Sequence, residues 1–180
     1  MRNLEQLLTQ YAAYHRDERN LKTHFVGVPM IVFSIILAFA QMVVGPVHLG
    51  WVIIVPAMAY FLYLDRPLGF SLAAYLIANT LVASVLSALT GLTTCLVLAA
   101  LLFIGGWAIQ FLGHRYEGVK PAFLDDAMGL VISPLFLMAE IAFMLGHKKH
   151  LKNYIEARVG RTMPARNGAP IGPARSSFPA

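Results

Sequence analysis

Four long apolar stretches run through this chain of 180 residues and decide what it can fold into. A helix needs about 20 apolar residues to cross the hydrocarbon core of a bilayer. Three of the stretches supply between 20 and 22 residues each. The fourth has 16, so it crosses a thinned bilayer or borrows its flanking residues. The stretches are Phe25–Val44, Leu49–Leu64, Leu68–Leu89 and Leu92–Leu112.

The composition supports an integral membrane protein. Apolar residues make up 58% of the chain and charged residues 13%, whereas about a quarter of an ordinary soluble domain is charged. The single cysteine, Cys95, excludes an internal disulfide and a CxxC metal clamp. Most of the net charge of +5 belongs to the C-terminal tail beside a membrane. The charge therefore gives no reason to expect a nucleic-acid partner.

The basic residues predict the topology, because Lys and Arg gather in cytoplasmic segments. Four of them precede the first stretch, none lies in the turns Gly45–His48 and Thr90–Gly91, and seven follow Leu145. Four spans with both termini in the cytoplasm satisfy this alternation. A weaker stretch, Met128–Leu145, contains Pro134 and Glu140, which are poor choices for a lipid-facing span. We expect it to form a re-entrant or surface helix.

The ends of the chain complete the prediction. Leu4, Leu7, Leu8 and Tyr11 follow helical spacing and predict an N-terminal amphipathic helix. Residues 160–180 hold four prolines and three glycines, which predicts a disordered cytoplasmic tail. The expected fold is thus all-α, with one transmembrane domain over residues 1–159. The membrane is the cytoplasmic membrane of a bacterium, or the endoplasmic reticulum in a eukaryote.

The histidines at the edges of the apolar stretches are the first candidates for chemistry. Four residues beyond Tyr11, on the same helix face, lies His15. His24 follows nine residues later, about 13 Å along one straight helix. The two imidazoles can share a metal only if the chain turns between them. The charged stretch Asp17–Asn20 offers such a turn, with Asn20 as a plausible N-cap.

A second group lies where the fourth stretch ends. Trp107, Gln110, His114 and Glu117 fall on one helical face. A histidine and a glutamate three residues apart can present a metal ligand and a carboxylate together in helical bundles. An equally open alternative is structural, with His114 hydrogen-bonded to Glu117 at the helix end.

The remaining polar candidates have structural alternatives as well. Glu140 lies in an apolar run and needs a partner, which makes it either a functional carboxylate or a hydrogen-bonding link between helices. His147 and His150 lie among lysines and are expected on a solvated basic face. His48, on the opposite side of the membrane, is expected to be solvated in its turn.

Three ordered motifs resemble the membrane 2-hydroxy fatty acid dioxygenases of fungal α-oxidation, the Mpo-like family. They are YHRDERNLKTHFVGVP, WAIQFLGHRYEGVKPAFLDD and SPLFLMAEIAFMLG, within residues 11–29 and 107–146. The resemblance implies Fe(II) held by His15, His24 and His114, with Glu117 and Glu140 as candidate catalytic carboxylates. It also implies that a long-chain 2-hydroxy fatty acid and O₂ are converted to CO₂, water and an acid one carbon shorter.

Other classes of function compete with this one. A small transporter or channel would use Glu140 and Asn79 along a path, but the histidines gather at one face and not along a pore. A non-catalytic membrane scaffold would use the histidines as polar caps at the interface. Other di-iron lipid hydroxylases and desaturases carry HxxxH and HxxHH boxes, and neither pattern occurs in this chain. The dioxygenase is the function we predict.

Overall fold

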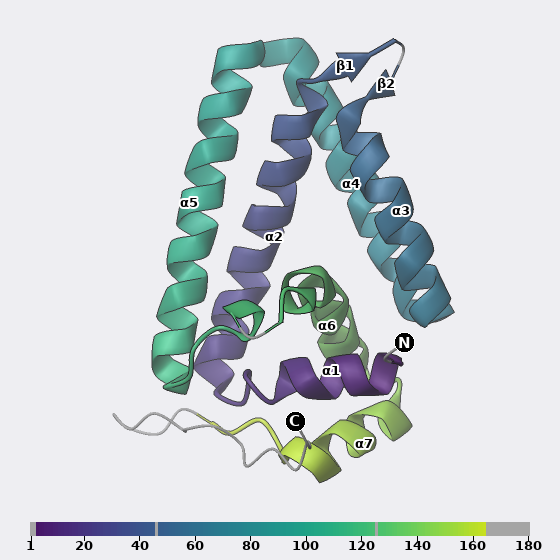
Figure 1. The fold of residues 1–180 in the computed structure, drawn as a ribbon, viewed down its shortest axis with the longest axis vertical. Helices are drawn as coiled ribbons and strands as arrows, with labels where there is room; N and C mark the ends of the chain where they lie inside the picture. The colour runs from purple at the N-terminus through teal and green to yellow at the C-terminus, as the bar shows by residue number, and fades with distance from the viewer. Residues whose placement is uncertain (1–2, 46, 125, 165–180) are drawn as a thin grey trace. The chain divides into compact units, whose positions relative to one another are not determined.

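The computed structural model describes residues 3–45, 47–124 and 126–164, and these form seven α-helices, a short 3-10 helix and a two-stranded hairpin (Figure 1). The predicted all-α fold is confirmed. In chain order the elements are α1 (Leu4–Ala12), α2 (Glu18–Ala40), β1 (Val43–Val44), β2 (Val47–His48), α3 (Leu49–Leu64), α4 (Arg66–Thr90), α5 (Leu92–Glu117), η1 (Ala122–Leu124), α6 (Met128–Met144) and α7 (Lys149–Val159).

The chain divides into two compact units. The first, here called the polar unit, comprises Met1–Val26 and Ile109–Ala180, and the second, the apolar unit, comprises Gly27–Ala108. The boundaries between them fall within α2 and α5. Each unit therefore contains part of these two helices together with elements of its own.

Several helices are built to cross a membrane. Among the described residues, α2, α4 and α5 are long and apolar enough to do so by themselves. The helix α3 covers the 16 apolar residues predicted for the second span. The helices α6 and α7 meet at an angle of 111°, as in a broken span or a re-entrant segment. Such a bend is compatible with the expected re-entrant or surface placement of Met128–Leu145, which stays a prediction.

Two helix ends differ from the predicted boundaries. The helix α2 begins at Glu18 and not after Asn20, because the charged residues before Asn20 are helical too. The Asp17 carboxylate accepts a hydrogen bond from the backbone N–H of Arg19 at 2.8 Å, as an N-cap side chain does. The prediction of Asn20 as the N-cap was therefore wrong. At the other end, Val43 and Val44 leave the helix and pair with β2.

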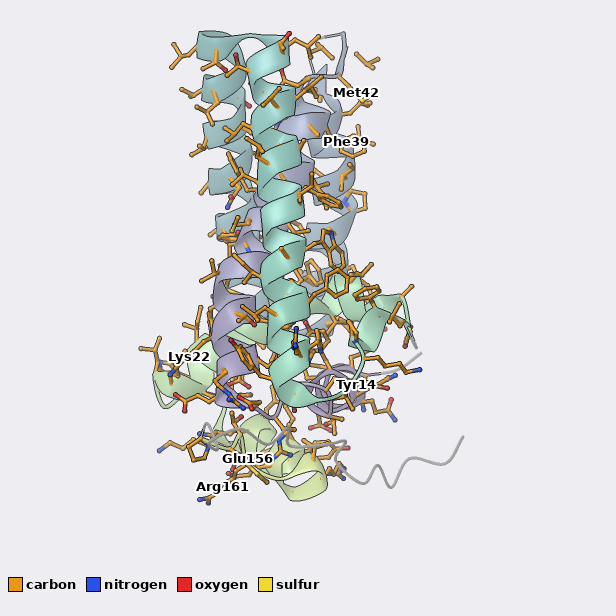
Figure 2. The ribbon with its side chains drawn as sticks, turned by 90° about the vertical axis from the view of Figure 1, so that its left-hand side faces the viewer. Tyr14, Lys22, Phe39, Met42, Glu156 and Arg161 are labelled. Atoms are coloured by element: carbon orange, nitrogen blue, oxygen red, sulfur yellow. The ribbon has the colours of Figure 1, made fainter. Side chains whose placement is uncertain are left out.

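The apolar unit contains a helical hairpin whose surface suits lipid. The helices α3 and α4 pack side by side (Figure 1), and Asp65 between them caps α4 by accepting from the Leu68 N–H. Large apolar side chains stay exposed along α4 and α5, including Leu89 at 76% and Ile104 at 67%. Side chains project outward along α5 in Figure 2. A soluble protein would bury such surface, whereas a bilayer covers it.

His48 does not have the solvated environment we expected. It is half-buried within the apolar unit, and its Nε2 lies 3.0 Å from the Ser84 hydroxyl. The prediction failed because the imidazole lies within reach of α4, where Ser84 gives its Nε2 a partner, although its Nδ1 has none among the described residues.

The polar unit is organised around α1, α6 and α7. The helix α1 starts with a capping box between Asn3 and Gln6, and it packs against both α6 and α7 (Figure 1). Its buried face contains Leu7, Leu8 and Tyr11, which confirms the predicted amphipathic helix. Residues 160–164 pair with the loop after α1 through a bridge between Asp17 and Met163. The rest of the predicted tail, 165–180, lies outside the described residues.

Candidate metal centre

Three histidines converge inside the polar unit. His15 lies in the loop after α1, His24 in the second turn of α2 and His114 in the last turn of α5. Each imidazole is at most 6% exposed, and one ring nitrogen from each lies within 4.8 Å of the others. The structure thus brings together the three residues that the sequence analysis named as metal ligands. Such a buried set of imidazoles is a candidate metal site.

The loop between α1 and α2 places the first two histidines face to face. The backbone N–H of His15 donates to the Ala12 carbonyl, and the chain then turns into α2 at Glu18. As a result the Nε2 atoms of His15 and His24 lie 3.0 Å apart. The chain does turn between the two histidines, as predicted, although it does so before Glu18 and not over Asp17–Asn20.

Hydrogen bonds to the backbone determine which ring nitrogens carry the protons. The Nδ1 of His15 lies 2.7 Å from the Tyr11 carbonyl, and the Nδ1 of His24 lies 2.9 Å from the Asn20 carbonyl. A carbonyl oxygen can only accept, so both Nδ1 atoms are protonated. In a neutral imidazole the Nε2 then bears a lone pair. Two lone pairs therefore face each other across 3.0 Å.

A cation bound by both nitrogens would relieve this repulsion between lone pairs. Burial, together with the charges of His24 and His114, holds the pKa of the His15 imidazole well below its ordinary value, so a shared proton is disfavoured. A metal ion satisfies both nitrogens. Imidazole ligands in metal sites commonly donate their other N–H to a carbonyl, which fixes the ring orientation in the same way. The donor set fits a metal that accepts neutral nitrogen ligands.

Two further buried atoms point to the same place. The Nδ1 of His114 and, one turn earlier on α5, the Oε1 of Gln110 have no hydrogen-bond partner among the described residues. Buried polar atoms without partners are costly, so each calls for an explanation by a bound group. For His114 a bond to a bound metal would supply that explanation. Gln110, which was predicted on the same helical face, supplies a second buried acceptor one turn before His114.

Glu117 holds the loop that carries His15. Its side chain is fully buried, and its carboxylate accepts from the backbone N–H groups of Arg16 and Asp17, each at 2.8 Å. The Asn20 amide donates to the same carboxylate at 3.0 Å. The contacts described for Glu117 do not include the alternative hydrogen bond to His114. Glu117 and His114 thus lie on one helix face, as predicted, but they act on different partners.

A glycine lets α5 approach α2 closely enough for these contacts. A Cβ atom at Gly113 would collide with the Asn20 amide oxygen and the Thr23 hydroxyl. Any larger residue would therefore push apart the helix ends that carry His24 and His114. The motif that contains Gly113 was visible in the sequence, but the reason for a glycine appears only in the packing.

Ion pairing stabilises the start of α2 on the same side. Arg19 contacts the Asp17 carboxylate at 2.7 Å and lies over the Tyr116 ring. Burial alone would raise the pKa of Asp17, but the hydrogen bonds and the charge of Arg19 outweigh it and lower that pKa. Asp17 therefore remains a carboxylate while it caps α2. The loop between α1 and α2 is thus held by Glu117 and by the pair of Asp17 with Arg19.

Tyr11 forms one wall of the cluster. Its ring stacks on His15 with centroids 4.1 Å apart and planes within 7°. Its hydroxyl lies 2.7 Å from the Ser133 hydroxyl on α6. Burial raises the pKa of the Tyr11 phenol, so this group stays neutral. The sequence pattern marked Tyr11 only as a residue of the apolar helix face. Its four-residue spacing from His15 was the available signal that the two rings lie together.

A cavity of about 330 Å³ opens beside His15. It lies between α1, α6 and α7, and its wall is half apolar, with Phe136 and Phe143 among the lining residues. Glu140 lies on this wall and not in the histidine cluster. The charged residues on the wall are Arg16, Glu140, Lys152, Glu156 and Arg161.

The two histidines of the basic segment stay outside the site. His147 and His150 are both exposed. The prediction of a solvated face for them is confirmed. It followed from their position among lysines in the sequence. Asp125, at the end of the second motif, lies outside the described residues.

Comparisons with known proteins agree with this geometry. A family model described as 2-hydroxy-palmitic acid dioxygenase Mpo1-like matches residues 1–145. The chain belongs to this family, as its three motifs predicted. It is 30% identical over 157 residues to the 2-hydroxy-palmitic acid dioxygenase MPO1 of Saccharomyces cerevisiae, a match that covers 86% of this chain and 88% of the yeast protein. No solved structure matches the chain.

Proposed function

We propose that this protein is an Fe(II)-dependent dioxygenase that shortens long-chain 2-hydroxy fatty acids by one carbon. The observation that carries the proposal is the pair of Nε2 lone pairs held 3.0 Å apart beside His114 in a member of this family. A 2-hydroxy acid and one O₂ balance one CO₂, one water and the shortened acid. The balance includes no external reductant.

Iron is the metal that suits both the ligands and the reaction. Neutral imidazoles accept zinc, copper, nickel and iron alike, and a reaction that reduces O₂ favours a metal that changes its oxidation state, which argues against zinc. Among the remaining metals the resemblance to the family implies iron. Iron supplies this redox chemistry when bound. In our proposal His15, His24 and His114 hold it, and three protein ligands leave positions for substrate and oxygen.

The carboxylates have separate roles in this proposal. Glu117 is a positioning residue, because its hydrogen bonds to Arg16 and Asp17 keep His15 turned toward His24. Glu140 lies on the cavity wall with His15 and takes part in catalysis by accepting the proton of the substrate hydroxyl. The apolar part of the same wall receives the alkyl chain.

The proposal also covers the surroundings of the enzyme. Exposed apolar side chains on α4 and α5 support a location in a bilayer, and the distribution of Lys and Arg supports a topology with both termini in the cytoplasm. The substrate then enters from the lipid with its polar head at the cytoplasmic face, where the histidines lie. O₂ dissolves in the same apolar phase.

Metal loading and turnover test the proposal together. Purified protein, loaded anaerobically, should hold about one Fe(II) per chain and consume one O₂ per 2-hydroxyhexadecanoic acid, with pentadecanoic acid as the product. His24→Ala should abolish both iron retention and turnover, while the exposed His150→Ala serves as the matched control. Full activity in a preparation freed of metal would contradict the mechanism.

A further inference from the structure

The Arg16 guanidinium is a buried cation that makes no direct carboxylate contact among the described residues. Burial lowers the pKa of Arg16, and the charges of Glu117 and Glu156 act against this effect without a direct ion pair. The Arg16 side chain is 4% exposed, and its Nε has no hydrogen-bond partner among the described residues. Its Nη2 donates to the Arg161 carbonyl, which is a neutral acceptor. A buried guanidinium is costly unless its donors are matched by an anion. Arg16 is therefore prepared for a partner that is not part of the protein.

The nearby carboxylates are engaged elsewhere. Glu117 faces the backbone N–H of Arg16, not its guanidinium. Glu156 lies 3.9 Å from the Lys152 ammonium and 3.5 Å from the Nε of Arg161 (Figure 2). Both of these carboxylates thus have other partners. Neither gives Arg16 a direct ion pair.

The position of Arg16 identifies the kind of anion. Arg16 lines the cavity next to His15, so a group bound to it lies beside the histidine cluster. Three cations and two carboxylates line this cavity, which leaves room for one more negative charge. A guanidinium matches the two oxygens of a carboxylate through paired N–H donors. Apolar residues of the same wall, such as Phe143, suit a long alkyl chain.

We propose that Arg16 binds the carboxylate of the 2-hydroxy fatty acid and makes the enzyme selective for the acid over uncharged analogues. This inference rests on the proposed function, because that function supplies the substrate. Arg16 directly follows His15 in the chain, so one loop positions both a metal ligand and the anchor for the bond to be broken. The Glu117 carboxylate fixes that loop through the backbone of Arg16.

The test compares an acid with its neutral analogue. Binding of 2-hydroxyhexadecanoic acid and of its primary amide is measured anaerobically on the iron-loaded full chain, so that no turnover occurs. Wild-type protein should prefer the acid. Arg16→Met should bind the acid about tenfold to a hundredfold more weakly and the amide unchanged, as expected when hydrogen bonds to a charged group are lost. Arg16→Lys keeps the charge without the paired donors, so its affinity for the acid should lie between those of the wild type and Arg16→Met.

Controls separate anchoring from folding. Arg158→Met removes an exposed guanidinium from α7, away from the cavity lining, and should leave both affinities unchanged. Iron content is measured for every variant, and KM in turnover should rise more than kcat falls. An acid preference that survives in Arg16→Met, or an equal loss for acid and amide, overturns the inference. If Arg16→Met loses its iron, Arg16→Lys is used for the comparison instead. An unchanged preference for the acid in Arg16→Lys would also contradict the inference.

The same experiment keeps the two proposals apart. Wild-type protein that prefers the acid but consumes no O₂ would contradict the dioxygenase and leave the anchor standing. Wild-type protein that turns over while Arg16→Met keeps its preference for the acid would contradict only the anchor.

Discussion

The polar and apolar units bury different kinds of polar side chain. In the described part of the apolar unit the buried polar side chains are hydroxyls, those of Ser34 and Thr80, and each donates to a carbonyl of its own helix. The polar unit also buries two hydroxyls, those of Thr9 and Ser133, but in addition it buries imidazoles, carboxylates and a guanidinium. These bond across long distances in the chain, as Glu117 does with Arg16, 101 residues away.

The difference separates structural from functional polarity. A hydroxyl that bonds to its own helix is satisfied locally and needs no tertiary arrangement. Buried ionisable groups cost several kcal/mol each unless other segments satisfy them, so a protein keeps them where they act. The polar unit has several such groups around three histidines and is therefore where we propose that the reaction takes place.

The largest effect should come from removing a ligand. His114→Ala should reduce bound iron and O₂ consumption to the level of the metal-free protein, because only two imidazoles remain. His48→Ala in the apolar unit breaks a hydrogen bond to Ser84 and should leave the iron content unchanged. Iron content is measured by elemental analysis. Equal loss in both variants would erase the distinction between the units.

Removing the carboxylate behind the loop should come next. Glu117→Ala leaves the buried N–H groups of Arg16 and Asp17 without acceptors, at a cost of about 3 kcal/mol, and weakens iron binding. Glu18→Ala, which loses only an exposed pair with Lys22, should cost less than about 0.5 kcal/mol. Thermal unfolding and iron titration in detergent measure both. Unaltered iron affinity in Glu117→Ala would remove its positioning role.

Close packing provides the third comparison. Gly113→Ala places a methyl group against Asn20 and Thr23 and should destabilise the protein by about 1–3 kcal/mol, with weaker iron binding. Gly105→Ala, on the same helix but in the apolar unit, meets only the flexible end of Met30 and should be nearly neutral. Should the two variants unfold at the same temperature, helix approach at Gly113 is not a requirement of the site.

The smallest effect should come from single hydroxyls. Tyr11→Phe removes the hydrogen bond to Ser133 but keeps the ring stacked on His15, so it should cost about 1 kcal/mol. Ser34→Ala in the apolar unit should cost less, because the Ile31 carbonyl keeps its place within the helix. Unfolding temperatures compare the two. A larger loss for Ser34→Ala would reverse the expected ranking.

Much of this arrangement was visible in the sequence. Apolar stretches located the spans, and histidines at their edges, with a turn between His15 and His24, indicated the metal site. Helix ends were less predictable, because hydropathy marks where a helix meets lipid and not where its hydrogen bonds begin. Residues 18–22, three of which are charged, precede the apolar stretch and are nevertheless helical.

What the sequence could not show is which distant groups meet. Nothing local to Glu117 reveals that its carboxylate accepts from the N–H groups of Arg16 and Asp17. Arg16 likewise looked like one charge in a charged run, although it is buried and lines a cavity. Partners of this kind depend on the tertiary approach of α5 to the N-terminal loop, which single-residue patterns do not contain.

The distance in sequence between Arg16 and Glu117 also determines the order in which parts of the site can form during translation. Chains grow by about 5–20 residues per second, so the N-terminal loop waits between about 5 and 20 s for the carboxylate that fixes it, 101 residues later. During that interval His15 and His24 lack His114 as well. We therefore expect iron to be captured only after α5 has been made and inserted. A ribosome stalled before α5 would carry a nascent chain with two of the three ligands and no stable centre.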